Sequence, residues 1–389
     1  MERGGTRTSA AMLIASQGLS RRAALTGAAS IVATAATLPC QLQAREPGSA
    51  ANTLGSLGAA KGLLVGASFA MHETERPYGA RYRELYIREM RSLTTELELK
   101  MPTVRPSRDI IEFEPADQFF DFAGKHGLPV RGHTLVWNDN VPQWIKSLNT
   151  LDAGYHMDAH IETVLERFRG RAFAWDVVNE PIAPWDRLPG NLRAGPYLAA
   201  YGEDYIARSF RLARQFDPAA KLVLNEAFTE TADDLGQAFR ASFLNLVRRL
   251  KDQGAPIDAI GLQCHLKSGK PYDFPRFCAF VEQLAALDFD IHITELDVDD
   301  SAYPRNLSAR DLRVAALYRD FLTAVLAIPA VKVLTFWQLA DHTSWLYYGD
   351  TEKRPRAVSR PRPLPFDQHF SRKPAWFAIA DSLSAMPPR

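Results

Sequence analysis

The sequence has little of several features that define whole classes of protein. Only three cysteines occur in 389 residues, and two of them, Cys264 and Cys278, lie in the body of the chain. These two could form one disulfide, but buried free thiols explain them at least as well. The nine histidines are scattered, and no group of cysteines and histidines has the spacing of a metal site. We therefore expect a fold without a disulfide framework, a metal site or a cofactor.

An excess of one charge and a long hydrophobic run are also lacking. The 46 Lys and Arg residues nearly balance the 45 Asp and Glu residues, and a net charge of +1 gives no reason to expect nucleic acid as a partner. An apolar stretch at residues 23–38 is too short and too rich in Ala, Gly and Thr for a membrane span. No glycine-rich dinucleotide-binding motif follows the first predicted strand, residues 62–70. We expect a monomer without a stable membrane anchor.

The first residues resemble an export signal and not a folded domain. The segment Ser20-Arg21-Arg22-Ala23-Ala24-Leu25 has a twin-arginine pattern, and Ala44 offers a small residue for cleavage. We interpret residues 1–44 as a twin-arginine signal peptide and residues 45–60, rich in Gly, Ala and Ser, as a linker. A flexible tail with a chance arginine pair is the alternative. Residues 61–389 then form a single domain of a periplasmic or secreted protein.

The rest of the chain alternates between two hydrophobic patterns. Continuous runs of Val, Ile and Leu, typical of strands covered on both faces, predict strands at residues 62–70, 94–99, 129–137, 173–180, 221–227, 259–266, 290–298 and 331–339. Amphipathic segments predict helices between them at residues 82–93, 115–126, 156–168, 205–216, 232–250, 275–287 and 309–326. Eight such units favour an α/β fold with a closed (β/α)8 barrel, a TIM barrel, over an open sheet.

Polar and aromatic residues gather at the carboxyl ends of these predicted strands. In a barrel all such ends meet at one face, where the active sites of this fold lie. The residues are Glu96, Lys100, His133, Trp137, Asn179, Glu180, Asn225, Glu226, Gln263, His265, Glu295, Asp297 and Trp337. Chance does not readily bring so many functional types to equivalent positions, so we predict that they form one site.

Two glutamates stand out because each follows a run of β-forming residues. Glu180 closes the string Val177-Val178-Asn179-Glu180, and Glu295 lies within Ile293-Thr294-Glu295-Leu296-Asp297. Two carboxyl groups that face one cleft are what hydrolysis of a glycosidic bond requires, one as proton donor and one as nucleophile or base. A separation of about 5–5.5 Å gives retention of the anomeric configuration, and roughly 6.5–9.5 Å gives inversion.

The pair is expected to divide the two roles, because two neighbouring carboxyl groups do not both ionise readily. The pKa of one group should rise, and that residue becomes the acid. We assign Glu180 as acid/base and Glu295 as nucleophile, although the residues alone do not fix this order.

Neighbouring polar residues can support such chemistry. Asn179 can donate to a carboxylate or to a sugar hydroxyl. His265 and Asp297 could form a relay in which Asp297 orients the imidazole and the imidazole keeps Glu295 ionised. His292, by contrast, is interpreted as a core residue inside its strand.

Several of the seven tryptophans are placed to contact a sugar. Trp137, Trp337 and Trp345 lie at strand ends or just beyond, where an indole face can stack on a sugar ring. Trp175 lies in the middle of a predicted strand and is interpreted as core. Two acids, aromatic platforms and donors from Asn, Gln, His and Lys together describe a cleft for a polysaccharide.

Six sequence motifs carry a family resemblance over roughly residues 60–385. They are Arg131-Gly132-His133-Thr134-Leu135-Val136-Trp137; Trp175-Asp176-Val177-Val178-Asn179-Glu180-Pro181; Gly261-Leu262-Gln263-Cys264-His265; Ile293-Thr294-Glu295-Leu296-Asp297; Phe336-Trp337 through Ser344-Trp345; and Pro365-Phe366-Asp367 with Lys373-Pro374-Ala375. In order and spacing they resemble glycoside hydrolase family 10, the endo-1,4-β-xylanases.

The resemblance implies an eightfold barrel and retaining hydrolysis of β-1,4-xylan, with Glu180 as acid/base and Glu295 as nucleophile. It also implies sugar contacts from Glu96, Lys100, His133, Trp137, Asn179, Gln263, Trp337 and Trp345.

Four positions depart from the family's pattern. Leu97 stands where the family has Asn, Met101 replaces a Trp, Asn138 replaces a His and Ala227 replaces a Tyr. Leucine cannot make the hydrogen bonds of an amide, so recognition of the sugar two units before the cleaved bond is expected to differ. One lost hydrogen bond costs about 1 kcal/mol.

Three functions follow, of which an exported retaining xylanase is the leading prediction. The four altered positions leave room for a family relative that acts on another β-linked glycoside or on a decorated oligosaccharide. A carbohydrate-binding barrel without turnover is the non-enzymatic alternative, which the presence of both glutamates and of His265 and Asp297 disfavours.

Overall fold

The computed structural model describes residues 52–348 and 360–389, so the predicted signal peptide, residues 1–44, lies outside the described residues. The strands are β1 (Leu64–Phe69), β2 (Ser92–Thr95), β3 (Val130–Val136), β4 (Ala172–Asn179), β5 (Lys221–Glu226), β6 (Ala259–Leu262), β7 (His265–Lys267), β8 (Asp290–Asp299) and β9 (Val331–Phe336). The main helices are α2 (Gly79–Glu89), α4 (Glu114–Lys125), α6 (Thr150–Phe168), α8 (Asp204–Phe216), α9 (Asp234–Asp252), α10 (Phe274–Ala285), α11 (Leu307–Val325) and α13 (Pro374–Ala385).

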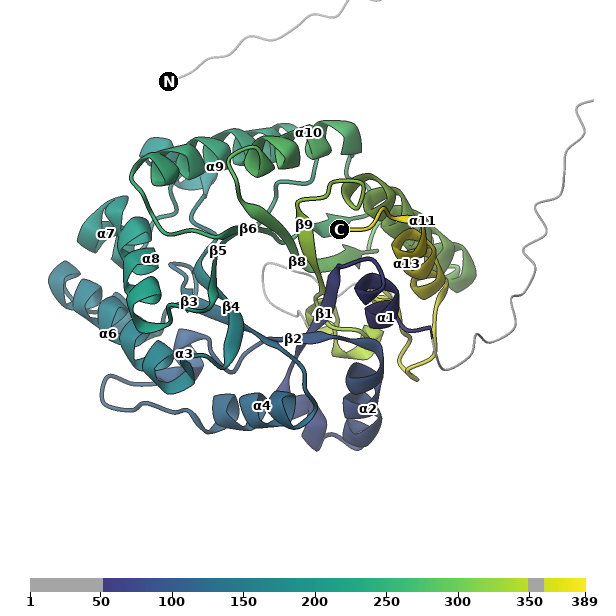
Figure 1. Ribbon diagram of the computed structural model, residues 1–389, viewed down its shortest axis with the longest axis horizontal. Helices are drawn as coiled ribbons and strands as arrows, with labels where there is room; N and C mark the ends of the chain where they lie inside the picture. The colour runs from purple at the N-terminus through teal and green to yellow at the C-terminus, as the bar shows by residue number, and fades with distance from the viewer. Residues whose placement is uncertain (1–51, 349–359) are drawn as a thin grey trace, which may run out of the picture. The chain divides into compact units, whose positions relative to one another are not determined.

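All strand pairs in the sheet are parallel, and the sheet closes on itself. Its order is β6-β5-β4-β3-β2-β1-β9-β8, and a further pairing between β6 and β8 completes the ring. Figure 1 looks into this ring of strands, with the helices around its outside. The predicted (β/α)8 barrel is confirmed. The physical reason is that strands made of Val, Ile and Leu need cover on both faces, which the helices outside and the packed interior provide.

The sixth predicted strand, residues 259–266, is broken in the structure. β6 ends at Leu262, and β7 begins at His265 and pairs only with β8. Between them Cys264 adopts a left-handed backbone conformation with φ 58°, which a regular strand does not accommodate. Because of this break, the side chains of Gln263 and His265 do not follow the alternation of one continuous strand. Both remaining cysteines, Cys264 and Cys278, are free thiols.

The second part of the predicted linker, residues 45–60, contains a helix in the structure. Residues Leu54–Ala59 form helix α1, capped by Thr53, with Leu54 fully buried. The buried carboxylate of Glu89 in α2 explains this order, because it accepts hydrogen bonds from the Leu54 amide (3.2 Å) and from the Trp376 indole of α13 (3.2 Å). The segment is thus fastened to the barrel by hydrogen bonds that a composition rich in Gly and Ala does not reveal.

The barrel interior holds one charged cluster among its apolar side chains. Arg131 forms a buried ion pair with Asp176 and donates to His292 Nδ1 (3.0 Å). His292 and Trp175 are core residues, as predicted. No helix in the described part of the chain is long and apolar enough to cross a membrane.

Candidate active site

The carboxyl ends of the strands surround a cleft of about 380 Å³. The cleft is lined by eleven of the fourteen residues predicted for the site: Glu96, Lys100, His133, Trp137, Asn179, Glu180, Gln263, His265, Glu295, Trp337 and Trp345. Asn225, Glu226 and Asp297 are buried behind it. Asn225 contacts Glu295 and Asp297 contacts His265, whereas Glu226 accepts hydrogen bonds from the Ile182 and Ala227 amides. Residues separated by about 250 positions in sequence therefore share one hollow, as the barrel topology requires.

Glu295, on β8, is held by a donor at each carboxylate oxygen. Asn225 Nδ2 donates to Oε1 at 2.8 Å, and His265 Nε2 donates to Oε2 at 3.2 Å. The other ring nitrogen of His265 donates to Asp297 Oδ1 at 2.8 Å. Asp297 Oδ2 in turn accepts from the Trp345 indole at 2.6 Å. The hydrogen-bonded chain expected from the sequence is present, and Trp345 extends it.

This chain of contacts sets the charges of Glu295 and His265. Burial alone raises the pKa of Glu295, but the hydrogen bond from His265 and the positive charges of His133 and His265 bring it below its usual value. Burial lowers the pKa of His265, but the carboxylates of Asp297 and Glu295 outweigh this and raise it to about 10. At neutral pH the site therefore contains an ionised carboxylate beside a protonated imidazole.

Glu180 lies just after β4 and has different neighbours. Its Oε2 accepts from Arg193 Nη2 (3.0 Å) and the Trp137 indole (3.3 Å), and its Oε1 accepts from Gln263 Nε2 (3.0 Å). Arg193 also donates through Nε to the Glu180 backbone carbonyl at 2.7 Å. One guanidinium thus fixes both the main chain and the side chain of this glutamate.

Left-handed backbone conformations occur at four strand ends, and two of the residues that adopt them, Glu180 and Phe228, line the cleft. Glu180, Phe228, Cys264 and Gln338 follow β4, β5, β6 and β9, and all have positive φ angles between 51° and 73°. Such conformations cost on the order of 1–3 kcal/mol each and persist only where the surroundings hold them. For Glu180, the Arg193 contact and a backbone bond to the Asn225 carbonyl (2.9 Å) do so.

Amide side chains connect the surroundings of the two glutamates. Asn179 Oδ1 accepts hydrogen bonds from Asn225 Nδ2 (2.8 Å) and from Gln263 Nε2 (3.3 Å). Asn225 also donates to Glu295, and Gln263 also donates to Glu180. Asn179 therefore links the donors of the two glutamates. Asn225 fits because its neighbour is Gly261, where an added Cβ would meet Asn225 Oδ1 at 2.3 Å. The Gly261 of the sequence motif therefore makes room for a contact to Glu295.

At one end of the cleft a buried carboxylate lies beside a lysine. Glu96 accepts hydrogen bonds from Ser68 Oγ (3.1 Å) and from Gln338. Burial, only partly offset by the charge of Lys100, raises the pKa of Glu96 to about 7. The ammonium of Lys100 lies 5.5 Å from the ring centre of Trp137 and 5.9 Å from that of Trp337.

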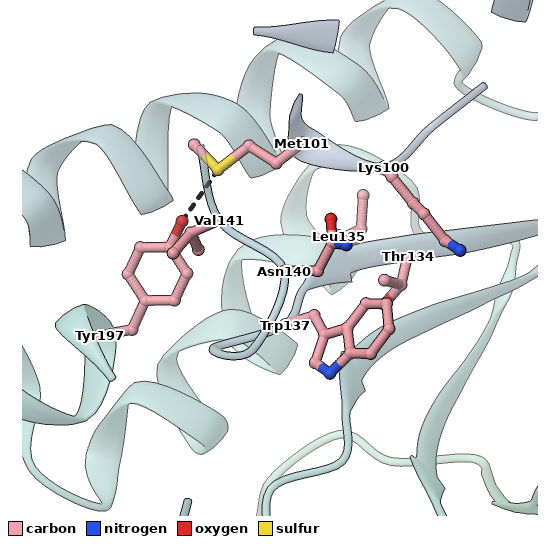
Figure 2. A pocket seen from close by; sticks show the side chains of 8 residues that line it. All are labelled: Lys100, Met101, Thr134, Leu135, Trp137, Asn140, Val141 and Tyr197. Atoms are coloured by element: carbon pink, nitrogen blue, oxygen red, sulfur yellow. Dashed lines mark hydrogen bonds between the residues drawn. The ribbon is translucent and has the colours of Figure 1, made fainter. Parts of the chain in front are cut away.

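Only two of the four unusual positions line the cleft, Leu97 and Ala227. Met101 is buried in a narrow crevice on the other side of Lys100 and Trp137, where its sulfur accepts a hydrogen bond from Tyr197 (Figure 2). Asn138 is also buried, and its Oδ1 accepts from the Tyr197 amide at 3.2 Å. These two residues support the wall of the cleft from behind and do not face a sugar.

Six further residues line the cleft that the sequence reasoning did not assign to the site: Asp139, Trp185, Arg193, Phe228, Glu230 and Lys267. Phe228, Glu230 and Lys267 lie at or a few residues after predicted strand ends, and this position could have indicated that they belong to the site. Trp185 and Arg193 lie in the long loop after β4, where nothing in the pattern marks them. In residues 52–348 and 360–389 no three His, Cys, Asp or Glu side chains are grouped so as to hold a metal ion.

Comparisons with known proteins agree with this site. A family model described as glycosyl hydrolase family 10 matches residues 53–382. A β-1,4-xylanase of Dictyoglomus thermophilum is 32% identical over 308 residues, covering 77% of this chain and 83% of the relative. Endo-1,4-β-xylanase B of Thermotoga neapolitana is 30% identical over 317 residues, covering 79% and 84%.

Solved structures give the same result. Native xylanase 10B of Thermotoga maritima has a TM-score of 0.76 at 29% identity, covering 85% of this chain and 98% of the other. Xylanase 10B of Thermotoga petrophila RKU-1, solved in complex with xylobiose, also has a TM-score of 0.76 at 29% identity, covering 85% and 97%. With the match of the family model over most of its length, the chain belongs to glycosyl hydrolase family 10.

Proposed function

We propose that this protein is an endo-1,4-β-xylanase that retains the anomeric configuration, with Glu295 as nucleophile and Glu180 as acid/base. The observation that carries the proposal is that two glutamates with different surroundings line one cleft. Glu295 is buried, doubly hydrogen-bonded and has a lowered pKa, which suits a nucleophile that must be ionised. The related xylanases support xylan as the substrate.

In the first step Glu180 donates its proton to the oxygen of the scissile bond while a Glu295 oxygen attacks the anomeric carbon. The leaving sugar departs with the Glu180 proton, and a covalent glycosyl ester remains on Glu295. Asn225 and His265 keep the attacking carboxylate ionised and oriented. Trp137 and Gln263 orient the Glu180 carboxyl group from both sides.

In the second step Glu180, now a carboxylate, removes a proton from a water molecule. The water oxygen attacks the anomeric carbon from the side that the leaving sugar vacated, and the ester bond to Glu295 breaks. Two inversions return the sugar in its original β configuration. As the charge returns to Glu295, the protonated His265 is in position to stabilise it.

The product formed from linear xylan tests this proposal. We expect NMR spectra taken in the first minutes to show newly formed β-anomers of short xylo-oligosaccharides, which convert to the α/β mixture only later. Initial α-anomers would contradict the retaining mechanism. Xylose as the sole early product would contradict endo action.

A second candidate is a family member tuned to a decorated oligosaccharide. The observation that favours it is a second hollow of about 290 Å³, which meets the cleft at Glu96, Leu97 and Trp345 and is also lined by His72 and Arg76. The apolar Leu97 side chain, 40% exposed, lies at this junction. A panel of linear and branched oligosaccharides separates the candidates, because a xylanase of the first kind prefers the linear substrates.

We also propose export by the twin-arginine route, followed by action in the periplasm or outside the cell. The support is the Arg21-Arg22 pair with its apolar stretch and the Ala44 cleavage position. Replacement of both arginines by lysine should leave the unprocessed protein in the cytoplasm. Unchanged export would contradict this route.

A further inference from the structure

One guanidinium lies between two carboxyl groups of the cleft. Arg193 Nη2 donates to Glu180 Oε2 at 3.0 Å, and Arg193 Nη1 lies 3.6 Å from Asp139 Oδ2. All three side chains line the cleft. The proposed mechanism gives a role to Glu180 but none to Arg193 or Asp139.

The loop after β4 brings Arg193 back to Glu180, which lies 13 positions earlier in the chain. Ile182 and Leu192 form an isolated antiparallel bridge, and the Arg193 amide donates to the Pro181 carbonyl at 2.7 Å. The guanidinium donates through Nε to the Glu180 carbonyl at 2.7 Å and through Nη2 to the Ile182 carbonyl at 3.4 Å. Main-chain acceptors therefore hold the guanidinium in place, whether or not the Glu180 carboxyl group is ionised.

Burial makes the counter-charges of Arg193 important. Its side chain is 6% exposed, whereas that of Glu180 is 14% and that of Asp139 is 61% exposed. A buried cation is costly unless an anion lies beside it. An ionised Glu180 supplies that anion. When Glu180 is protonated, Asp139 is the remaining carboxylate within 4 Å of Arg193 in the described part of the chain.

The other ionisable groups around Glu180 do not replace this pair. Arg193 is the one cation that forms an ion pair with Glu180 among the described residues. Glu226 lies behind it on β5, and burial, together with the charge of Glu180, raises the pKa of Glu226 well above its usual value. Glu226 is therefore biased toward its neutral form. The remaining ionisable side chains that line the cleft are Glu96, Lys100, His133, Glu230, His265, Lys267 and Glu295.

We propose that Arg193 and Asp139 are positioning residues that together set the protonation state of Glu180 in the two steps of the reaction. The inference rests on the proposed function and deepens it. The positive charge of Arg193 favours the carboxylate form of Glu180, which takes a proton from water in the second step. The negative charge of Asp139 opposes this effect, so that Glu180 can hold the proton that it donates in the first step.

The dependence of kcat/KM on pH tests this proposal. The leaving sugar of xylotetraose needs a proton, so kcat/KM should fall at high pH as Glu180 of the free enzyme ionises. The fluoride ion that leaves β-xylobiosyl fluoride needs no proton, so this substrate should lack that basic limb.

Two substitutions should move the basic limb for xylotetraose in opposite directions. Arg193→Met should move it to higher pH by about one unit, because loss of the cation favours the protonated form of Glu180. Asp139→Asn should move it to lower pH by about half a unit, because the charge of Arg193 then acts on Glu180 without opposition. Asp139 is exposed, so its variant carries the test even if Arg193→Met does not fold.

A conservative variant and a matched pair of controls separate charge from structure. Arg193→Lys keeps the positive charge and should leave the basic limb within about 0.3 pH units of the wild type. Arg211→Met and Asp204→Asn remove the partners of an exposed ion pair (3.0 Å) outside the cleft lining, and neither should move the limb.

Opposite shifts on xylotetraose, with an unmoved profile on the fluoride, support the inference, because a purely structural loss does not reverse sign between the two variants. No shift in Asp139→Asn, or shifts of both variants in one direction, would overturn the inference while the proposed function stands. The same basic limb on both substrates in the wild type would overturn the proton-donor role of Glu180, and the inference with it.

Discussion

The two glutamates of the cleft are held in opposite ways. Glu295 lies within strand β8, its side chain 6% exposed between an amide and a protonated imidazole. Glu180 lies just beyond β4 in a left-handed conformation, its side chain 14% exposed and fixed by Arg193. The surroundings of Glu295 lower its pKa and so favour the ionised form. Glu180 lies at the edge of the sheet and has the more exposed side chain of the two.

This difference supports the two roles proposed for Glu295 and Glu180. A nucleophile must stay ionised, and the two donors at Glu295 stabilise its anion. An acid/base must gain and lose a proton in each cycle, so it needs access to the leaving group and to water.

Glu295→Ala should have the largest effect. Loss of the nucleophile is expected to lower kcat on xylan by at least about 10⁴-fold, because no glycosyl ester can form. Added azide should restore turnover of β-xylobiosyl fluoride: azide attacks the anomeric carbon in place of Glu295, fluoride leaves, and the product is α-xylobiosyl azide, of configuration opposite to the substrate. The measurement is reducing-sugar release together with NMR of the azide product. Undiminished hydrolysis of xylan would exclude Glu295 as nucleophile.

Glu180→Ala should be less damaging and should depend on the substrate. We expect a loss of about 10²–10⁴-fold on xylan, where the leaving sugar needs a proton. Formation of the glycosyl enzyme from β-xylobiosyl fluoride needs little acid assistance and should be much less affected. Stopped-flow fluoride release measures this step. An equal loss of xylan hydrolysis and of the fluoride burst would argue against the acid/base role.

His265→Gln should remove a charge while one amide donor remains. The loss of the imidazolium raises the pKa of Glu295, so the acidic limb of the kcat/KM profile should move to higher pH, with a loss of roughly 10–100-fold near neutrality. An unmoved acidic limb would contradict this role.

The same substitution should also change how the free energy of unfolding depends on pH. In the wild type the pKa of His265 is raised to about 10, so its contribution to the free energy of unfolding is full below its ordinary pKa of about 6.5 and is lost as pH rises through about 10. Urea unfolding curves measured between pH 6 and 10 should therefore converge for wild type and His265→Gln.

Leu97→Asn should have the smallest effect and the opposite sign. An amide at this exposed position can hydrogen-bond a sugar hydroxyl, which is worth about 1 kcal/mol, or about fivefold in KM for xylo-oligosaccharides. Activity on branched oligosaccharides serves as the comparison. A higher KM on linear substrates would indicate that Leu97 packs against the native ligand.

Much of the site followed from local pattern. Short apolar runs predicted the strands, and the residues after them, such as Glu96, Gln263 and Trp337, line the cleft. The chain Asp297–His265–Glu295 was also accessible, because a strand alternation brings Glu295 and Asp297 to one face. Closure of the barrel then brings these residues together, since it places every strand end at the same rim.

Other features were not accessible from pattern. Arg193 holds Glu180 from 13 positions away through a loop whose path depends on packing. Met101 and Asn138 were noted as departures from the family's pattern, but the sequence does not show that both contact Tyr197, whose buried hydroxyl and amide need partners. The hydrogen bond from the Leu54 amide to Glu89, which holds residues 54–59, could not be predicted for the same reason.

Hydrophobic periodicity is a local property, so the amino-acid sequence was enough to predict the barrel and most residues at its rim. The neighbours of each carboxyl group depend on the folded chain, and so does the lowered pKa of Glu295. Electrostatic effects depend on distances of a few ångströms between residues that are remote in sequence. The part of the cleft lined by Trp185, Phe228 and Lys267 arises in the same way, from segments that only the closed barrel brings together.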